Sequence, residues 1–290
     1  MVACAERPRY AGAVMTAVAA KYAKRYWKKY EAISAWTAMA AYMSTFVLWG
    51  IAFLPDSGDR ALIALSVIPL GVLLDYVLHR WQTGRPNWES ALITSCIVTV
   101  LMPTGIEWYV PPLAVAVAIG SKHFLLLGEG GKRGGKRHVF NPASTGVALT
   151  ALLFGYSLGW WPDSFLWLTI AFDLLNAWRA KRVTASVTFL AVYAALLALT
   201  LGSLPLGGFA FGGLGVQSVP LILPYFFAFF MVVEPVTSLG PRRQQVEFGT
   251  LVALTTFALS YVPAVAPAAP LWGLLVANMY ARLRTAIPGA

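Results

Sequence analysis

Charged residues and cysteines are scarce in this chain of 290 residues. Asp, Glu, Lys and Arg make up 12% of it, whereas soluble domains carry roughly a quarter. The only two cysteines, Cys4 and Cys96, exclude a disulfide framework and a CxxC metal motif. No phosphate-binding P-loop, dinucleotide-binding glycine motif or Ser/His/Asp set follows a predicted strand. Catalysis of the kind found in soluble enzymes is therefore not supported.

Apolar residues, in contrast, are abundant and form long runs. They make up 58% of the chain, and the mean hydropathy is +0.66. A helix needs about 20 apolar residues to cross the hydrocarbon core of a bilayer. We therefore predict an all-α polytopic membrane protein with about ten transmembrane segments. The full-length candidates are 33–54, 61–79, 183–202, 219–234, 246–262 and 270–283, and the shorter or interrupted ones are 90–102, 108–127, 142–157 and 164–178.

The net charge of +10 comes from cations in short patches between the apolar runs. Because these cations do not follow one continuous face, nucleic acid is not expected as a partner. With ten crossings and an inner N-terminus, every basic loop falls on the inner side, and the outer loops hold only Arg60. We therefore expect a multi-pass protein of the cell membrane with both termini in the cytoplasm.

Residues 1–32 differ from the rest in composition. Cations such as Lys24 and Arg25 are interleaved there with aromatic residues such as Tyr26 and Trp27. A basic helix of this kind is suited to lie on anionic lipids at the inner membrane surface. An ordinary positive flank of the first membrane helix is equally consistent with these residues. The remainder, 33–290, is predicted to be a single transmembrane domain.

The apolar segments are broken by polar residues and proline at corresponding places in two halves. One break precedes Asn141 and the other ends at Glu234. Interrupted helices in corresponding positions are typical of inverted repeats, in which the breaks meet near the membrane midplane and form a binding site. We therefore predict a first repeat over 33–158 and a second over 163–290, joined near 159–162.

The break in the first half follows a loop rich in glycine and cations, 128–137. Asn141 is a suitable N-cap and Pro142 a suitable first helical residue, with the hydroxyls of Ser144 and Thr145 just behind them. A helix N-terminus beside cations favours an anionic or electron-accepting ligand. Alternatively, Asn141 and Pro142 only start a helix, and the cations only orient it.

The break in the second half carries Glu234, followed by Thr237 and Ser238. A carboxylate at the edge of hydrocarbon is costly and is a candidate functional residue. Alternatively, Glu234 is a structural carboxylate paired with Arg242, Arg243 or a backbone amide.

Other charged and histidine residues of the segments have simpler interpretations. Pairing of Lys122 with a carboxylate would explain its place in an apolar segment. The three histidines, His79, His123 and His138, have no i, i+4 spacing among themselves, so no metal site is expected.

Three motifs resemble the NqrB/RnfD family, the membrane subunits of the sodium-pumping NADH:quinone reductase and of the Rnf ferredoxin:NAD oxidoreductase. The first runs from Gly71-Val-Leu-Leu-Asp to Arg85-Pro and Ser90-Ala-Leu-Ile-Thr, and the second is Phe140-Asn-Pro-Ala after the glycine-rich loop. The third, Met231-Val-Val-Glu-Pro-Val-Thr-Ser, is similar to the family's Met-Ala-Thr-Asp-Pro-Val-Thr. The resemblance extends from about Leu70 to the C-terminus.

This resemblance implies two inverted repeats of five helices, as in urea transporters, and a membrane subunit of an electron-transport system coupled to ion translocation. Other membrane or soluble redox subunits would be its partners. The family's Ser-Gly-Ala-Thr motif for covalent FMN is missing from the chain, so no covalent FMN is expected. A noncovalent flavin, riboflavin or FMN, is implied instead. Its expected contacts are Phe140, Asn141, Pro142, Ser144, Thr145, Glu234, Thr237, Ser238 and Lys122.

The missing attachment motif also leaves a second function open. A chain with the repeats of a urea transporter but without the complete set of redox groups could be a transporter or channel for a small solute, such as a urea-like molecule or a flavin.

Overall fold

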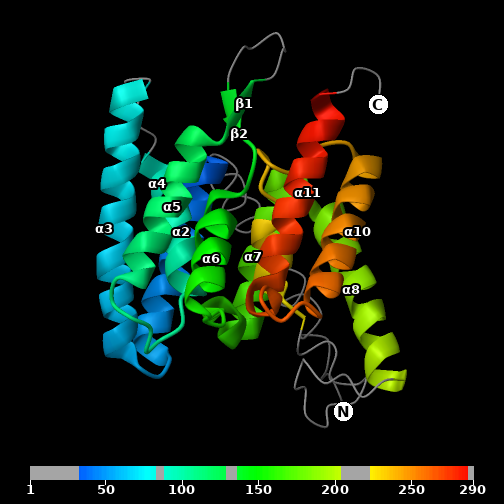
Figure 1. Cartoon of the computed structure of the whole chain (residues 1–290), viewed down its shortest axis with the longest axis horizontal. Helices are drawn as coiled ribbons and strands as arrows, with labels where there is room; N and C mark the ends of the chain where they lie inside the picture. Colours follow the sequence, from blue (N-terminus) through cyan, green and yellow to red (C-terminus); the bar gives the residue numbers. More distant parts are fainter. Residues whose placement is uncertain (1–32, 83–87, 129–135, 204–222, 287–290) are drawn as a thin grey trace, which may run out of the picture.

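The computed structural model describes residues 33–82, 88–128, 136–203 and 223–286, and these form a bundle of helices (Figure 1). The expected basic helix of residues 1–32 lies outside the described residues, as does part of the segment expected at 219–234. Helices occur in each of the other nine segments expected from the apolar runs. The helical fold class is thus correct for the described residues.

The first half begins with a helix whose N-cap, Ser34, immediately precedes it in the sequence. Ser34 accepts a hydrogen bond from the backbone N–H of Thr37 and so provides one of the missing partners of the first turn. At the end of the half, Gly155 terminates the last helix in the left-handed conformation that glycine adopts readily. The helices are α2 (Ala35–Phe53), α3 (Ser57–Gln82), α4 (Trp88–Leu101), α5 (Val110–Phe124) and α6 (Pro142–Phe154).

The second half contains similar long helices and one irregular segment. Between 223 and 241, helical structure is confined to residues 225–231, of which Phe227–Met231 is a π-helix labelled η3. The long helix expected over 219–234 therefore differs from the structure in its described part. The other elements are η1 (Trp161–Phe165), α7 (Leu166–Ala180), α8 (Val183–Ser203), α10 (Arg242–Leu259), η4 (Ala266–Ala268) and α11 (Ala269–Ala286).

Three helices within the described part of the chain are long and apolar enough to cross a membrane: Ala35–Phe53, Ser57–Gln82 and Val183–Thr200. The helices α4 and α6 are also apolar but shorter. Large apolar side chains such as Leu65 and Trp167 lie on the outside of the bundle, where they are 70% and 82% exposed. Such a surface suits a lipid solvent better than water, and the structure is compatible with an all-α membrane protein.

A two-stranded hairpin is the exception to the helical architecture. Strands β1 (Leu126–Gly128) and β2 (Lys136–His138) pair antiparallel, with Leu126 opposite His138. The hairpin occupies the two ends of the glycine-rich stretch that was expected to be a loop. It returns the chain from the end of α5 to the start of α6, beside one end of the helix bundle (Figure 1).

The helices of the two halves have corresponding neighbours. In the first half α5 packs against α3 and α6, and in the second α10 packs against α8 and α11. Glycine permits the closest approaches, as is common between membrane helices. A Cβ on Gly146 of α6 would lie 2.2 Å from the carbonyl of Ala114 in α5, and one on Gly273 of α11 would lie 2.5 Å from the hydroxyl of Thr256 in α10. The halves also contact each other through α6 with α11 and through α2 with α7.

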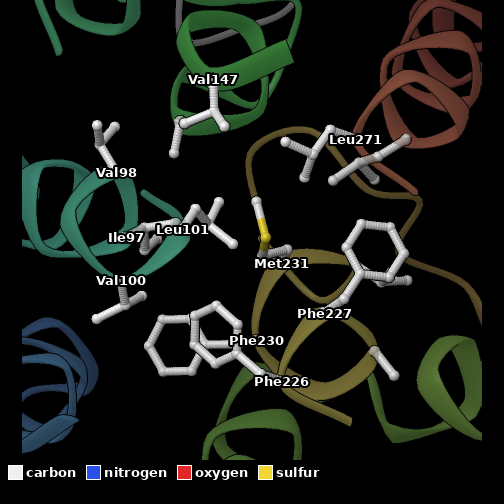
Figure 2. Packing of buried hydrophobic residues seen from close by; sticks show 14 of the residues in the cluster. Ile97, Val98, Val100, Leu101, Val147, Phe226, Phe227, Phe230, Met231 and Leu271 are labelled. Carbon is white, nitrogen blue, oxygen red and sulfur yellow. The ribbon is translucent and has the colours of Figure 1, made fainter. Parts of the chain in front are cut away.

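The π-helix lies in the centre of the buried core. Its aromatic side chains and Met231 face α4, α6 and α11 in Figure 2, where Leu101, Val147 and Leu271 represent these three helices. Phe226 and Phe230 stack with their ring centroids 5.3 Å apart. Apolar packing therefore holds this irregular segment against both halves and sets the position of Glu234, which comes three residues after it.

Candidate binding site where the two breaks meet

The first break is positioned by the start of α6. The side-chain oxygen of Asn141 accepts a hydrogen bond from the backbone N–H of Ser144 at 2.9 Å, so Asn141 is the N-cap, as predicted. This bond leaves the amide nitrogen of Asn141 available for another partner. It donates to Oε2 of Glu234 at 2.8 Å. The structure thus brings together the two breaks, which lie 93 residues apart in the sequence.

Glu234 is surrounded by neutral and imidazole donors. Its Oε2 also accepts from the hydroxyl of Thr237 at 2.9 Å, and its Oε1 lies 3.3 Å from Nε2 of His138. The sequence left open that Arg242 or Arg243 pairs with this carboxylate. Among the residues that the structure describes neither does, and Arg243 pairs instead with Glu247 at 3.6 Å. The carboxylate therefore belongs to the polar centre and is not tied to the basic loop that comes after it.

A cavity of about 30 Å³ lies next to the bond between Asn141 and Glu234. This is enough space for one or two water-sized groups. Elements of both halves line it: Trp36 and Met39 of α2, Ser90, Ile93, Thr94 and Ile97 of α4, Lys122 of α5, His138, Asn141, Pro142, Ala143, Phe230, Glu234 and Pro235.

Lys122 lines this cavity, but its charge is bound elsewhere. Its Nζ donates to Oδ1 of Asp75 at 2.8 Å, so the predicted pairing of Lys122 with a carboxylate is confirmed. Asp75 is almost completely buried, with 1% of its surface exposed. Two histidines contact the same carboxylate: Nε2 of His123 lies 3.0 Å from Oδ1, and Nδ1 of His79 lies 3.0 Å from Oδ2.

Two residues of α11 that the sequence did not reveal hold both breaks. The side-chain oxygen of Asn278 accepts from the backbone N–H of Asn141 at 2.9 Å, and its nitrogen donates to the carbonyl of Thr237 at 3.3 Å. One turn later, Arg282 donates to the carbonyls of His138 at 2.8 Å and Val236 at 3.1 Å. No local signal marks these residues, because a single Asn or Arg in an apolar helix is compatible with many roles.

The remaining predicted site residues lie around the centre and do not line the cavity. Phe140 is half-buried against the core. Thr145 donates its hydroxyl to the carbonyl of Asn141, whereas the buried hydroxyl of Ser144 has no partner among the described residues. Ser238 donates to the carbonyl of Glu234 and accepts from Nε of Arg182 at 3.2 Å. The hydroxyls of Thr145 and Ser238 thus stabilise the backbone at the breaks.

The cavity is too small for a flavin in the described conformation. Pockets that enclose ligands of that size typically measure on the order of 300 Å³ or more, ten times this cavity. The Asn141 amide also uses one acceptor site in the N-cap bond and one donor in the bond to Glu234. The site as it stands therefore has the size and polarity for water, a proton or a small ion.

Comparison with known proteins adds no family assignment. No model of a protein family matches the chain, and no curated protein matches it either. The resemblance to the NqrB/RnfD family therefore stays a prediction from the three motifs.

Proposed function

We propose that the chain is a membrane subunit of an electron-transport system similar to the NqrB/RnfD family, and that its polar centre serves the ion-translocating part of that system. In this proposal ten segments form two inverted repeats, with both termini in the cytoplasm. The single observation that carries it is the hydrogen bond between Asn141 and Glu234. It joins the two motifs that resemble the family, one from each half.

The chemistry of the centre suits a small cation or a proton. Glu234 supplies a carboxylate at the end of a buried segment, and an ionisable residue in such a place is costly without a function. The amide of Asn141 and the hydroxyl of Thr237 solvate it without neutralising it. Within the described part of the chain no lysine or arginine pairs with this carboxylate, so a proton or a small cation could bind Glu234 without that competition.

Binding of a noncovalent flavin, which the resemblance implies, is a separate proposal from the ion-translocating role. Because the cavity is too small for the ring system, flavin binding would require the Asn141 amide and the cavity walls to rearrange. The purified chain would then be yellow, with an absorption spectrum that a reductant bleaches. A colourless, correctly folded preparation would remove the flavin without removing the ion-translocating role.

The ion-translocating role is tested in membrane vesicles from cells that lack the chain and are complemented with variants. Ion uptake is measured after addition of NADH or reduced ferredoxin. We expect the unaltered chain to restore uptake and Asn141→Leu or Glu234→Gln to lower it strongly, with normal amounts of protein in the membrane. The matched control is Glu247→Gln, since Glu247 is a half-buried carboxylate paired with Arg284 on other helices. Full uptake with both variants of the centre would contradict the proposal.

A second function, passage of a small uncharged solute, is favoured by the size of the cavity. A space of about 30 Å³ lined by an amide, a carboxylate and apolar residues is compatible with a molecule little larger than water. Liposomes that contain the purified chain alone would then take up such a solute down its gradient, without an electron donor. Uptake that depends on the donor supports the first function, and uptake by the chain alone supports the second.

A further inference from the structure

A second polar cluster lies between the C-terminal ends of α3 and α5, next to the cavity but outside the bond between Asn141 and Glu234. It consists of Asp75, His79 and His123. Asp75 and His79 are four residues apart on α3 and so share one helix face. His123 comes from the last turn of α5. One ligand-type atom from each of the three residues lies within 4.8 Å of the others.

The spacing of these atoms is close to that of metal ligands. At bond lengths of about 2.0–2.1 Å, the ligands of a tetrahedral zinc ion lie about 3.3 Å apart. Oδ1 of Asp75 lies 3.0 Å from Nε2 of His123, and Oδ2 lies 3.0 Å from Nδ1 of His79. The three ligand atoms lie within 4.8 Å of one another, so the side chains would have to move closer together to share one metal ion. All three residues are shielded from solvent, Asp75 and His123 fully and His79 in part.

Gln82 orients the ring of His123, as hydrogen-bond partners of metal-binding histidines commonly do. Its side-chain oxygen lies 3.0 Å from Nδ1 of His123, and its nitrogen donates to the carbonyl of the same residue at 3.4 Å. The Gln82 oxygen accepts only if Nδ1 carries the proton. Nε2 of His123 then faces Oδ1 of Asp75 at 3.0 Å, where either a second ring proton or a metal ion can join the two atoms. A hydrogen bond to the other ring nitrogen is the usual way in which a metal-binding histidine is oriented.

A buried oxygen without a hydrogen bond gives an independent indication. Oδ2 of Asp75 has no solvent exposure and accepts no hydrogen bond within the described part of the chain. Nδ1 of His79 lies 3.0 Å from this oxygen but makes its hydrogen bond to the backbone carbonyl of Asp75 at 3.1 Å, a bond that a metal ion on Nδ1 would replace. A buried carboxylate oxygen normally has a donor or a cation. Here it faces into the group of ligand atoms.

We propose that Asp75, His79 and His123 bind a divalent first-row transition ion, for which Zn²⁺ is the probe. Two imidazoles and one carboxylate are a ligand set that such ions take up, with water in an open fourth position. The ammonium of Lys122 on Oδ1 of Asp75 competes with the ion. Binding would thus displace Lys122 from the carboxylate into the cavity that it already lines. This site does not depend on the function proposed above.

The test uses the full chain without a polyhistidine tag, purified in detergent and stripped of metal. Zn²⁺ binding is measured by calorimetry, and Co²⁺ substitution by visible absorption. We expect one ion per chain and a Co²⁺ spectrum with nitrogen and oxygen ligands. Asp75→Asn and His123→Gln should abolish both, and Gln82→Leu should weaken affinity about 10- to 100-fold, because it only orients His123.

Two variants make the outcome decisive. Lys122→Met removes the competing charge and should bind Zn²⁺ more tightly than the unaltered chain, so this variant gains a property and cannot be mistaken for a misfolded one. His138→Gln is the matched control, because His138 contacts Glu234 and not Asp75, and it should bind normally. Absence of binding by both the unaltered chain and Lys122→Met would overturn the site. Binding that survives Asp75→Asn and His123→Gln would overturn it as well.

Discussion

The two breaks that meet in the polar centre are built differently. At the first, Asn141 caps a regular helix, and the cap bond lies within four residues of sequence. At the second, Glu234 comes after a π-helix, and the next helix begins only at Arg242. Arg182 from a distant segment donates to Ser238, and Gln245 of the following helix donates to the carbonyl of Gly240. Both breaks also bond Asn278 and Arg282 of α11. The difference is that the first break has the local cap of a regular helix, whereas the second relies more on tertiary partners.

The largest effect is expected from Asn278, which bonds both breaks. Asn278→Leu leaves the N–H of Asn141 and the carbonyl of Thr237 without their buried partner. Because each orphaned group costs about 1–3 kcal/mol, we expect a loss of about 2–6 kcal/mol in the free energy of unfolding, measured in detergent. Val276→Leu on the exposed face of the same helix is the control. Equal stability of the two variants would show that α11 does not hold the breaks.

Arg282→Met tests whether the two breaks respond differently to the loss of a shared partner. It removes donors to the carbonyls of His138 and Val236. Because these two residues are only half-buried, water can replace part of each bond, and we expect a total loss of about 1–3 kcal/mol in the free energy of unfolding. Hydrogen exchange should rise more over 234–241 than over 141–148, because the α-helix retains its own bonds. If exchange rose equally in both segments, the difference between local and tertiary encoding would be refuted.

Substitutions of Asn141 measure the local part of the first break. Asn141→Ser retains an N-cap oxygen and loses only the bond to Glu234, whereas Asn141→Ala loses both. The difference between their stabilities should be the value of the cap, about 1 kcal/mol. Thermal unfolding of both variants in one detergent gives this difference. Equal stabilities would mean that the cap contributes nothing.

The smallest effect is expected from Thr145→Val. The hydroxyl of Thr145 donates only to the carbonyl of Asn141, within the same helix turn, and valine has nearly the same shape. The free energy of unfolding should change by no more than about 0.5 kcal/mol. A larger loss in the same thermal unfolding would show that hydroxyl contacts, in addition to the cap, stabilise the first break.

The sequence predicted the local features of this molecule well. Apolar runs located the helices of nine segments, and Asn141 with Pro142 marked the start of α6 because capping is a short-range interaction. The prediction that the breaks meet used only their corresponding positions in two halves. The π-helix was missed because a run such as Phe226–Met231 has the composition of an ordinary apolar helix.

Interactions between distant segments were harder to predict. The clamp by Asn278 and Arg282 depends on how α11 packs on α6, for which no residue pattern gives a direction. The cluster at Asp75 had a usable signal, since Asp75 and His79 are four residues apart. It was missed because only spacings between histidines were considered. Lys122 was expected to have a carboxylate partner, but its identity required the packing of α5 on α3.

The π-helix at Phe227–Met231 also fixes the direction in which Glu234 points. Relative to an α-helix, a π-helical turn accommodates one additional residue, and each residue of an α-helix advances the chain by about 100° around the axis. If the same residues formed an α-helix instead, the additional residue would turn Glu234 away from Asn141 by about that angle. The π-helical conformation of the aromatic run, as well as its composition, thus determines whether the carboxylate reaches the other half of the protein.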